Sequence, residues 1–538
     1  MSLRPPASPA ACSQQATPRA GLGLWAVAVA GFFLLTAAWA LADPLLSGPD
    51  EPAHLIRAEA IVRGQLIGRP ESSDADNPAT TVRVPGFLAQ SNSLRYWCFI
   101  FSTDTTALCA PPLTGPDHLI PLPTYVGHYP PLYYLAVGWP SLLNDGTTGV
   151  LFMRLVSALI NSLLLGSALF LAIRRSRLVM LALLVAVTPT VIYYSASVNP
   201  NGLEMTSAVC FWCAVLGLTM PWPSRQGASV TMSAPSSLAP AEIAIAAISG
   251  CVLASARGLS PAWLLIAVGA ALIGGDGARM RALAHRRGVR LTAVVLSVAI
   301  AAAVAWIIGE HGLDELGYPS RSSFPSLFHQ TLTATPHYLS EMVGIFGANN
   351  VPAPPFATTA VVVGLALIVL GAFVVGSWRE RVVLALLLLA IVAVPVASGV
   401  ATGHHYGLIW QGRYTLAVGV GSPIFAGYVV GAWFEKRRFE VGAGRLIPAV
   451  GAAAVLFALI LAVAQFTSFL WDLRRFMVGA DGPLSGVFAG IWHPPVDGFV
   501  LLVWAGCGAL AVALLTLRAA HGRQRVDGVG LGRRSDGI

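Results

Sequence analysis

Two neighbouring carboxylates and a histidine stand near the start of the chain, in the segment SGPDEPAHLIRA (47–58). Asp50 and Glu51 precede Pro52, and His54 follows within one helical turn. A carboxylate beside a reacting hydroxyl can remove its proton, and a group of such ligands can help to hold a divalent cation. We predict Asp50 and Glu51 as catalytic residues, and Asp50, Glu51 and His54 as the ligands of any Mg²⁺ or Mn²⁺ ion.

The same segment also has a purely structural interpretation. Proline suits the first position of a helix, and an acidic residue before it faces the positive end of the helix dipole. Leu55, Ala58, Val62 and Leu66 would then line one face of a helix lying along a membrane surface. The segment alone leaves both interpretations open.

Further polar residues occur in GHYPPLYYLAVGWP (127–140), YYSASVNPNGLE (193–204), GHHYGLIWQGRY (403–414) and WDLRR (471–475). Glu204 falls about one turn inside a predicted membrane span, where a carboxylate is costly and marks a functional candidate. Arg413 stands at the start of another span, where its guanidinium could bind a phosphate through forked hydrogen bonds. The predicted substrate-binding residues are His54, His128, Tyr129, Asn199, Asn201, Glu204, His404, His405, Gln411, Arg413 and Arg474.

Arg257, Arg474 and Arg475 are candidates for the same phosphate. Cationic side chains at the ends of spans also pair with lipid headgroups, so this second role stays open for all three.

The composition indicates a membrane protein. Of 538 residues, 55% are hydrophobic and only 11% are charged, and the mean hydropathy is +0.69. Soluble domains carry about 25% charged residues. Apolar runs of roughly 20 residues recur along the chain without strand-like alternation, which predicts an all-α polytopic fold and not a barrel. The net charge of +8 comes from short arginine clusters at span ends and does not suggest nucleic acid.

Twelve spans are predicted, at 21–42, 151–173, 178–195, 203–221, 240–256, 259–275, 291–309, 357–377, 382–400, 414–433, 446–468 and 498–517. Short basic clusters favour the cytoplasmic side, which places both termini inside. The predicted domains are a disordered cytoplasmic tail (1–20), a transmembrane domain (21–518) and a second disordered tail (519–538). The loops 43–149, 310–356 and 469–497 then lie outside, the first with interfacial helices.

The only cysteines in the predicted outer loops are Cys98 and Cys109. An oxidising exterior permits a disulfide between them, although spacing alone does not fix its geometry.

Several motifs resemble, in their order along the chain, those of a bacterial multispanning family known as domain of unknown function 2142. They are SGPDEPAHLIRA, HYPPLYYL, TPTVIYYSASVNPNGLE, MVGIFGANNVPAP and QGRYTLAVGVGSP, within roughly residues 45–480. That family is grouped with the GT-C glycosyltransferases, integral membrane enzymes that use polyprenyl-phosphate-linked sugars at the outer face. The resemblance implies a GT-C-like fold, a bacterial plasma-membrane location and an extracytoplasmic site with its acidic motif in the first outer loop.

The chain departs from the family pattern at two places. The family often has Asp where this chain has Asn201, and often a Trp-Leu-Asp run where it reads GANN (347–350). Both departures put a metal site in question.

We therefore expect a glycosyltransferase that moves a sugar from a polyprenyl phosphate to a glycan or lipid-linked acceptor of the cell envelope, among membrane lipids. A phosphate leaves as an anion and needs no general acid, so one base, Asp50, is enough for an inverting transfer. Two alternatives stay open: a lipid or glycan flippase or transporter, and a non-catalytic envelope-assembly protein. Twelve spans with both termini inside are common among transporters, but ionisable residues are scarce in the middles of these spans.

Overall fold

A computed structural model of the chain describes residues 18–71, 79–91, 96–144, 146–226, 229–231, 239–314, 316–441 and 446–527. Of the two predicted tails, residues 1–17 and 528–538 lie outside the described residues. Residues 18–20 instead open the first helix, and residues 519–527 continue the last one.

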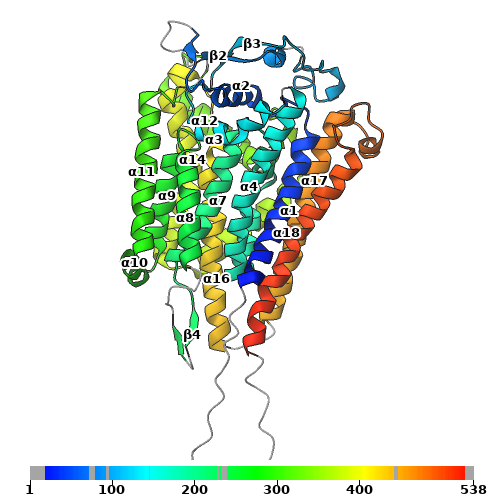
Figure 1. The fold of residues 1–538 in the computed structure, drawn as a ribbon. Coiled ribbons are helices and arrows are strands. Elements are labelled where there is room, and N and C mark those ends of the chain that lie inside the picture. Colours follow the sequence, from blue (N-terminus) through cyan, green and yellow to red (C-terminus); the bar gives the residue numbers. More distant parts are fainter. Residues whose placement is uncertain are drawn as a thin grey trace, which may run out of the picture.

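Long apolar helices form a bundle, which confirms the predicted all-α polytopic membrane fold (Figure 1). Nine spans within the described ranges are long and apolar enough to cross a membrane. They are formed by α1 (Pro18–Ala42), α4 (Thr147–Arg175), α7 (Pro200–Thr219), α11 (Arg287–Gly309), α13 (Pro355–Val375), α14 (Trp378–Tyr406), α15 (Gly412–Gly419) with α16 (Gly421–Val441), α17 (Leu446–Val478) and α18 (Gly498–Asp527).

A tenth span is broken. α5 (Arg177–Ala186) and α6 (Pro189–Ala196) meet at an angle of 62°. Pro189 has no N–H to continue the helical ladder, and side-chain hydrogen bonds tie the break to neighbouring helices. Gln465 Nε2 donates to the Val187 carbonyl at 2.8 Å, and the Thr188 hydroxyl donates to the Met342 carbonyl at 2.8 Å.

Two predicted spans, 240–256 and 259–275, coincide with the shorter apolar helices α8 (Ala239–Ala254) and α9 (Ser260–Gly274). Every predicted span therefore overlaps a helix, while the total of twelve membrane crossings stays a prediction.

The long segment between α1 and α4 covers one end of the bundle. We call this end of the bundle the α2 end. In Figure 1, α2 (Glu51–Val62) lies across this end, beneath strands β2 and β3. The antiparallel sheet has the order β1 (Arg69–Pro70), β2 (Thr80–Pro85) and β3 (Leu119–Thr124), with Thr80 opposite Thr124. The remaining elements of this end are α3 (Leu132–Gly138), α12 (Phe324–Gly344), β6 (Ile345–Phe346), β7 (Val351–Pro352) and the 3₁₀ turns Gly86–Gln90, Ala107–Cys109, Trp139–Leu142 and Leu484–Phe488.

α2 is not the surface helix that its apolar face suggested. All its residues from Glu51 to Ile61 are buried. The sheet and α3 pack over it, so its polar residues must find partners inside the protein. The opposite end of the bundle carries α10 (Gly277–Ala284) and the hairpin of β4 (Ser224–Gln226) and β5 (Ser229–Thr231) (Figure 1).

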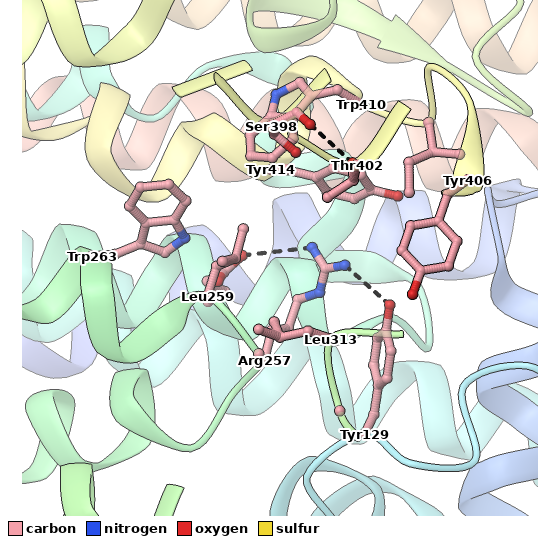
Figure 2. Close-up of a pocket in the computed structure, with 14 residues that line it drawn as sticks. Tyr129, Arg257, Leu259, Trp263, Leu313, Ser398, Thr402, Tyr406, Trp410 and Tyr414 are labelled. Atoms are coloured by element: carbon pink, nitrogen blue, oxygen red, sulfur yellow. Dashed lines mark hydrogen bonds and ion pairs between the residues drawn. The ribbon is translucent and has the colours of Figure 1, made fainter. Parts of the chain in front are cut away.

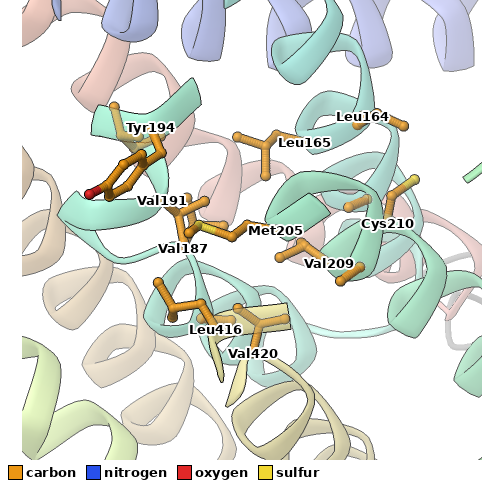
Figure 3. Close-up of a cluster of buried hydrophobic side chains, with 14 of the residues drawn as sticks. Leu164, Leu165, Val187, Val191, Tyr194, Met205, Val209, Cys210, Leu416 and Val420 are labelled. Carbon is orange, nitrogen blue, oxygen red and sulfur yellow. The ribbon is translucent and has the colours of Figure 1, made fainter. Parts of the chain in front are cut away.

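The centre of the bundle is a tight apolar core. Figure 3 shows Leu165 of α4, Val191 of α6, Met205 of α7 and Leu416 of α15 pointing toward one another. All four side chains are buried. Helices that are apolar on most faces belong in such an interior, and their packing fixes where α7 and α15 begin at the α2 end.

Candidate functional site

Asp50 occupies the turn before α2, but its carboxylate does not cap that helix. Its backbone is left-handed (φ 62°), and no side-chain capping bond to α2 forms. One carboxylate oxygen, Oδ1, instead accepts a hydrogen bond of 2.7 Å from the Tyr125 hydroxyl. The other, Oδ2, pairs with the Arg413 guanidinium. The Asp50 side chain is 30% exposed, and because it makes no capping bond, the helix-start interpretation does not account for it.

Arg413 is the second residue of α15 and is almost completely buried. Its Nη1 donates to the Tyr194 hydroxyl at 2.9 Å, and its Nη2 donates to the Tyr414 hydroxyl at 3.1 Å. The guanidinium carbon lies 5.2 and 5.0 Å from the centroids of these two rings. Phenol hydrogen bonds and cation–π contacts therefore hold a buried cation against Asp50.

The Asp50 carboxylate lines a cavity of about 300 Å³, which we call the Asp50 cavity. Trp97, Phe101 and Tyr125 contribute aromatic walls, and Asn349 and Gln411 contribute amides. The two amides are joined, because Asn349 Nδ2 donates to Gln411 Oε1 at 2.9 Å. An ionised carboxylate thus faces a space bounded by rings and amide groups.

Electrostatics keep Asp50 ionised. Burial raises the pKa of this carboxyl, but the Arg413 charge and the Tyr125 hydrogen bond act against burial, and the pKa lies below its usual value. Burial lowers the pKa of His54 to about 3, so its imidazole is neutral and shares a 2.9 Å hydrogen bond with the Tyr134 hydroxyl. Burial and the Asp50 charge raise the pKa of Tyr125, whose phenol therefore stays protonated. The site holds a carboxylate able to accept a proton beside a fixed cation.

A second cavity, of about 160 Å³, surrounds Arg257, and we call it the Arg257 cavity. Figure 2 shows the guanidinium pointing into it, with the Tyr129 hydroxyl at 3.4 Å. Tyr406, Trp410 and Tyr414 form much of the remaining wall. The Arg257 guanidinium carbon lies 4.5 Å from the Tyr414 ring centroid, so this ring contacts both the Arg257 and the Arg413 cations.

A chain of hydrogen bonds connects the Asp50 turn to Arg257. Asn199 Nδ2 donates to the Pro49 carbonyl at 2.9 Å, and Asn199 Oδ1 accepts from Asn201 Nδ2 at 2.7 Å. Asn201 Oδ1 then accepts from Arg257 Nη1, also at 2.7 Å. Glu204, one turn further along α7, lies 3.9 Å from Arg257 and accepts a hydrogen bond from the Ser260 hydroxyl at 2.6 Å. The predicted residues Asn199, Asn201 and Glu204 therefore support the two cavities together.

Glu51 does not share the position of Asp50, which corrects its predicted catalytic role. Its carboxylate is completely buried and pairs with Arg154, whose Nε donates to Oε1 at 2.8 Å. The Val198 amide also donates to it at 3.1 Å. Glu51 anchors the start of α2 to α4 and lines neither cavity.

The predicted metal ligands do not fit a shared ion. Glu51 is committed to Arg154, and both oxygens of Asp50 are engaged by Tyr125 and Arg413. Across the residues that the structure describes, no three His, Cys, Asp or Glu side chains are grouped closely enough to hold a metal. We therefore derive no step through a cation.

Four other predicted residues lie outside both cavities. The His128 carbonyl accepts a hydrogen bond of 2.9 Å from Trp306 Nε1. The His404 ring packs 4.6 Å from the Phe324 ring, and His405 neighbours Tyr406. Arg474 stacks 4.1 Å over the Trp471 ring. By contrast, Tyr129 and Glu204 line the Arg257 cavity, Gln411 lines the Asp50 cavity, and the buried His54 ring contacts the Tyr134 hydroxyl.

Sequence reasoning missed several residues that shape the site. Tyr125, Tyr194 and Tyr414 hold Asp50 and Arg413, and Arg154 holds Glu51. Each tyrosine stands in or near a segment dense in polar and aromatic residues, which was the one available signal. Arg154 lies within a long apolar helix, where a buried charge itself indicates a partner.

The loop above the Asp50 cavity is fixed at two points. A disulfide joins Cys98 to Cys109, the pairing that the sequence left open. Arg475 of α17 donates to the carbonyls of Thr105 and Ser102, at 2.7 and 2.9 Å. These bonds hold Trp97 and Phe101 over Asp50.

The search of curated proteins finds no significant relative. The sequence model of a family described as "Predicted membrane protein (DUF2142)" matches residues 33–421, which contain Asp50, Arg257 and Arg413. Because that match covers well over half of the chain, the protein belongs to the DUF2142 family of predicted membrane proteins.

Proposed function

We propose that the protein is a membrane-embedded glycosyltransferase with a GT-C-like fold. It would transfer a sugar from a polyprenyl-phosphate donor to a cell-envelope acceptor. The observation that carries this proposal is the Asp50 carboxylate, ionised, partly exposed and facing a cavity of rings and amides. Aromatic rings can stack on the apolar faces of sugars, and amides can bond their hydroxyls.

The chemistry needs one base and one anion-stabilising group. The acceptor oxygen forms a bond to the anomeric carbon of the donor, while the carbon–oxygen bond to phosphate breaks and phosphate leaves with the electron pair. The acceptor proton passes to Asp50. Displacement from the face opposite the phosphate inverts the anomeric centre. Because Arg413 lowers the basicity of Asp50, positioning of the hydroxyl must supply much of the rate.

The Arg257 cavity suits the phosphate end of a lipid donor. Its wall combines aromatic side chains such as Trp263 of α9 and Tyr406 of α14 with aliphatic residues of the neighbouring loops. The Arg257 guanidinium and the Glu204 carboxylate, 3.9 Å apart, are its charged groups. Arginine binds phosphate through planar, forked hydrogen bonds. Arg257 and Arg413 both contact the Tyr414 ring. A phosphate that leaves near Asp50 would therefore be stabilised by Arg413 as well as by Arg257.

The α2 end would face the outside of a bacterial plasma membrane, with both termini in the cytoplasm. The positive-inside rule supports this orientation. Arg281, Arg287 and Arg290 lie on α10 and the start of α11, at the end of the bundle opposite α2 (Figure 1).

Transfer in proteoliposomes tests the proposal. Purified protein, a polyprenyl-phosphate donor with a radiolabelled sugar, and envelope glycan as acceptor should give labelled glycan. Asp50→Asn should reduce transfer by at least about a hundredfold. The matched control Asp117→Asn removes an exposed carboxylate from the same loop and should retain wild-type transfer. Full transfer by Asp50→Asn would contradict the assignment of the base.

The same vesicles separate this proposal from the main alternative. A flippase would move the labelled lipid between leaflets without forming labelled glycan. The broken α5–α6 span gives that alternative its one structural argument, because discontinuous helices are common in transporters. Lipid movement that is unaffected by Asp50→Asn, without any transfer, would favour the flippase.

A further inference from the structure

A third cavity lies beside the C-terminal part of α17, outside the proposed reaction centre. Its volume is about 400 Å³. Asn350, Trp471, Arg474 and Asp481 are among its lining residues, and none of them lines the Asp50 cavity or the Arg257 cavity. We call it the Trp471 cavity.

The Trp471 cavity and the Asp50 cavity are separated by one hairpin tip. Ala348 and Asn349 line the Asp50 cavity, and the next residue, Asn350, lines the Trp471 cavity. Gly347 and Asn349 have positive φ angles of 57° and 61°, which make the connection between β6 and β7 tight. Asn350 Nδ2 donates to the carbonyl of Ile100 at 2.7 Å, and Ile100 lines the Asp50 cavity. The two cavities are therefore neighbours across this tip.

The two arginines of the Trp471 cavity are committed to the backbone. Arg474 donates to the Gly482 carbonyl at 3.2 Å and to the Ala480 carbonyl. Arg475 donates to three carbonyls of the loop that roofs the Asp50 cavity, including that of Phe99 at 2.5 Å. Their charges therefore fix loops, and a phosphate would have to displace these bonds.

The groups left for a ligand are an aromatic ring, an amide and a carboxylate. Trp471 supplies the ring, one face of which is covered by the Arg474 guanidinium. Asn350 supplies the oxygen of an amide whose nitrogen bonds to Ile100, and Asp481 supplies an exposed carboxylate. This set matches the rings and amides of the Asp50 cavity. It suits a neutral polyhydroxylated ligand, because the carboxylate accepts hydroxyl hydrogen bonds and repels anions.

We propose that the Trp471 cavity is a second sugar subsite for the same acceptor, which is a neutral oligosaccharide and not a single sugar or a lipid headgroup. The reacting end would lie at Asp50, and units further from that end would lie at Trp471. This inference rests on the proposed glycosyl transfer. The disulfide loop and Arg475 bridge the two cavities and hold them in a fixed relation, which limits the entropy lost on binding an extended chain.

Binding of oligosaccharides of two lengths tests the second subsite. The full-length protein in lipid nanodiscs would be titrated with a disaccharide and an octasaccharide cut from neutral envelope glycan, without donor. The wild type should bind the octasaccharide more tightly. Trp471→Ala should weaken octasaccharide binding about fivefold to tenfold, the range expected for loss of one ring contact, and leave the disaccharide unchanged.

Two further variants keep the test decisive. Trp378→Ala removes an exposed tryptophan at the start of α14, the opposite end of that helix from Tyr406. It should change the affinity for neither oligosaccharide. Asp481→Asn alters an exposed loop residue, so it tests the subsite even if Trp471→Ala does not fold, and it should weaken only the octasaccharide. Equal affinity of the wild type for both lengths, or equal weakening of both by Asp481→Asn, would overturn the subsite.

Sugar transfer to each oligosaccharide is measured separately from binding. Asp50→Asn should keep the length-dependent binding and lose transfer. If the wild type shows length-dependent binding but transfers no sugar to either probe, the proposed transferase activity fails while the glycan subsite stands.

Discussion

Asp50 and Arg413 stand 363 residues apart in the sequence and form an ion pair at the α2 end of the bundle. The pair joins the turn before α2 to the first turn of α15. Arg413 is buried, whereas Asp50 keeps access to its cavity. An ion pair with one buried and one accessible partner can orient a reactive carboxylate without closing it off.

The two adjacent carboxylates should respond differently to neutralisation. Glu51→Gln leaves the buried Arg154 without its charge partner, and losing one partner of a buried pair costs about 3–5 kcal/mol. Asp50→Asn should cost less, because Asp50 is partly exposed and Arg413 keeps two phenol partners. Thermal unfolding of the detergent-solubilised variants measures both. Greater loss of stability in Asp50→Asn than in Glu51→Gln would contradict these assignments.

Arg413→Lys should weaken use of the donor. A lysine ammonium is a point charge and cannot contact Tyr194, Tyr414 and Asp50 in one plane. We expect a KM for the lipid donor raised by about tenfold or more, with the folded protein recovered in normal yield. Arg321→Lys, at an exposed position, is the matched control and should leave KM unchanged. If the two variants have equal KM values, Arg413 is not part of donor binding.

The rate of transfer should be nearly flat from about pH 8 down to about pH 5. The pKa of Asp50 is lowered, so the active carboxylate is present above that pKa and is lost only as the pH falls through it. His54, with a pKa of about 3, stays neutral over this range. Tyr125→Phe removes a hydrogen bond that lowers the Asp50 pKa and should move the acid limb of kcat upward. An inflection near pH 6.5 in the wild type would point to a titrating histidine instead.

Accessibility of single cysteines should establish the orientation. Gln330 lies on α12 at the α2 end, and Ala282 lies on α10 at the opposite end; both are exposed. In a background without Cys12, Cys251 and Cys507, Gln330→Cys should react with an impermeant thiol reagent in intact cells. Ala282→Cys should react only after the membrane is opened. The reverse pattern would invert the protein and place Asp50 in the cytoplasm.

The apolar runs determined most of the fold. Each predicted span overlaps a helix, because a long apolar segment must satisfy its backbone hydrogen bonds internally. The break between α5 and α6 could be suspected from Pro189. Its contacts could not, because Gln465 bonds to the Val187 carbonyl and the Thr188 hydroxyl bonds to the distant Met342 carbonyl.

For the site, the sequence determined which residue types were out of place, and the tertiary structure decided what they do. Asp50 and Glu51 are neighbours, but consecutive residues at a helix start point in different directions, so one faces a cavity and the other faces Arg154. His404 and His405 lie in a polar segment, yet line neither the Asp50 cavity nor the Arg257 cavity. Local sequence patterns predict which residues are buried and where helices end. The ion pair of Asp50 with Arg413 arises only from how α2 and α15 pack, and no pattern within either segment encodes that contact.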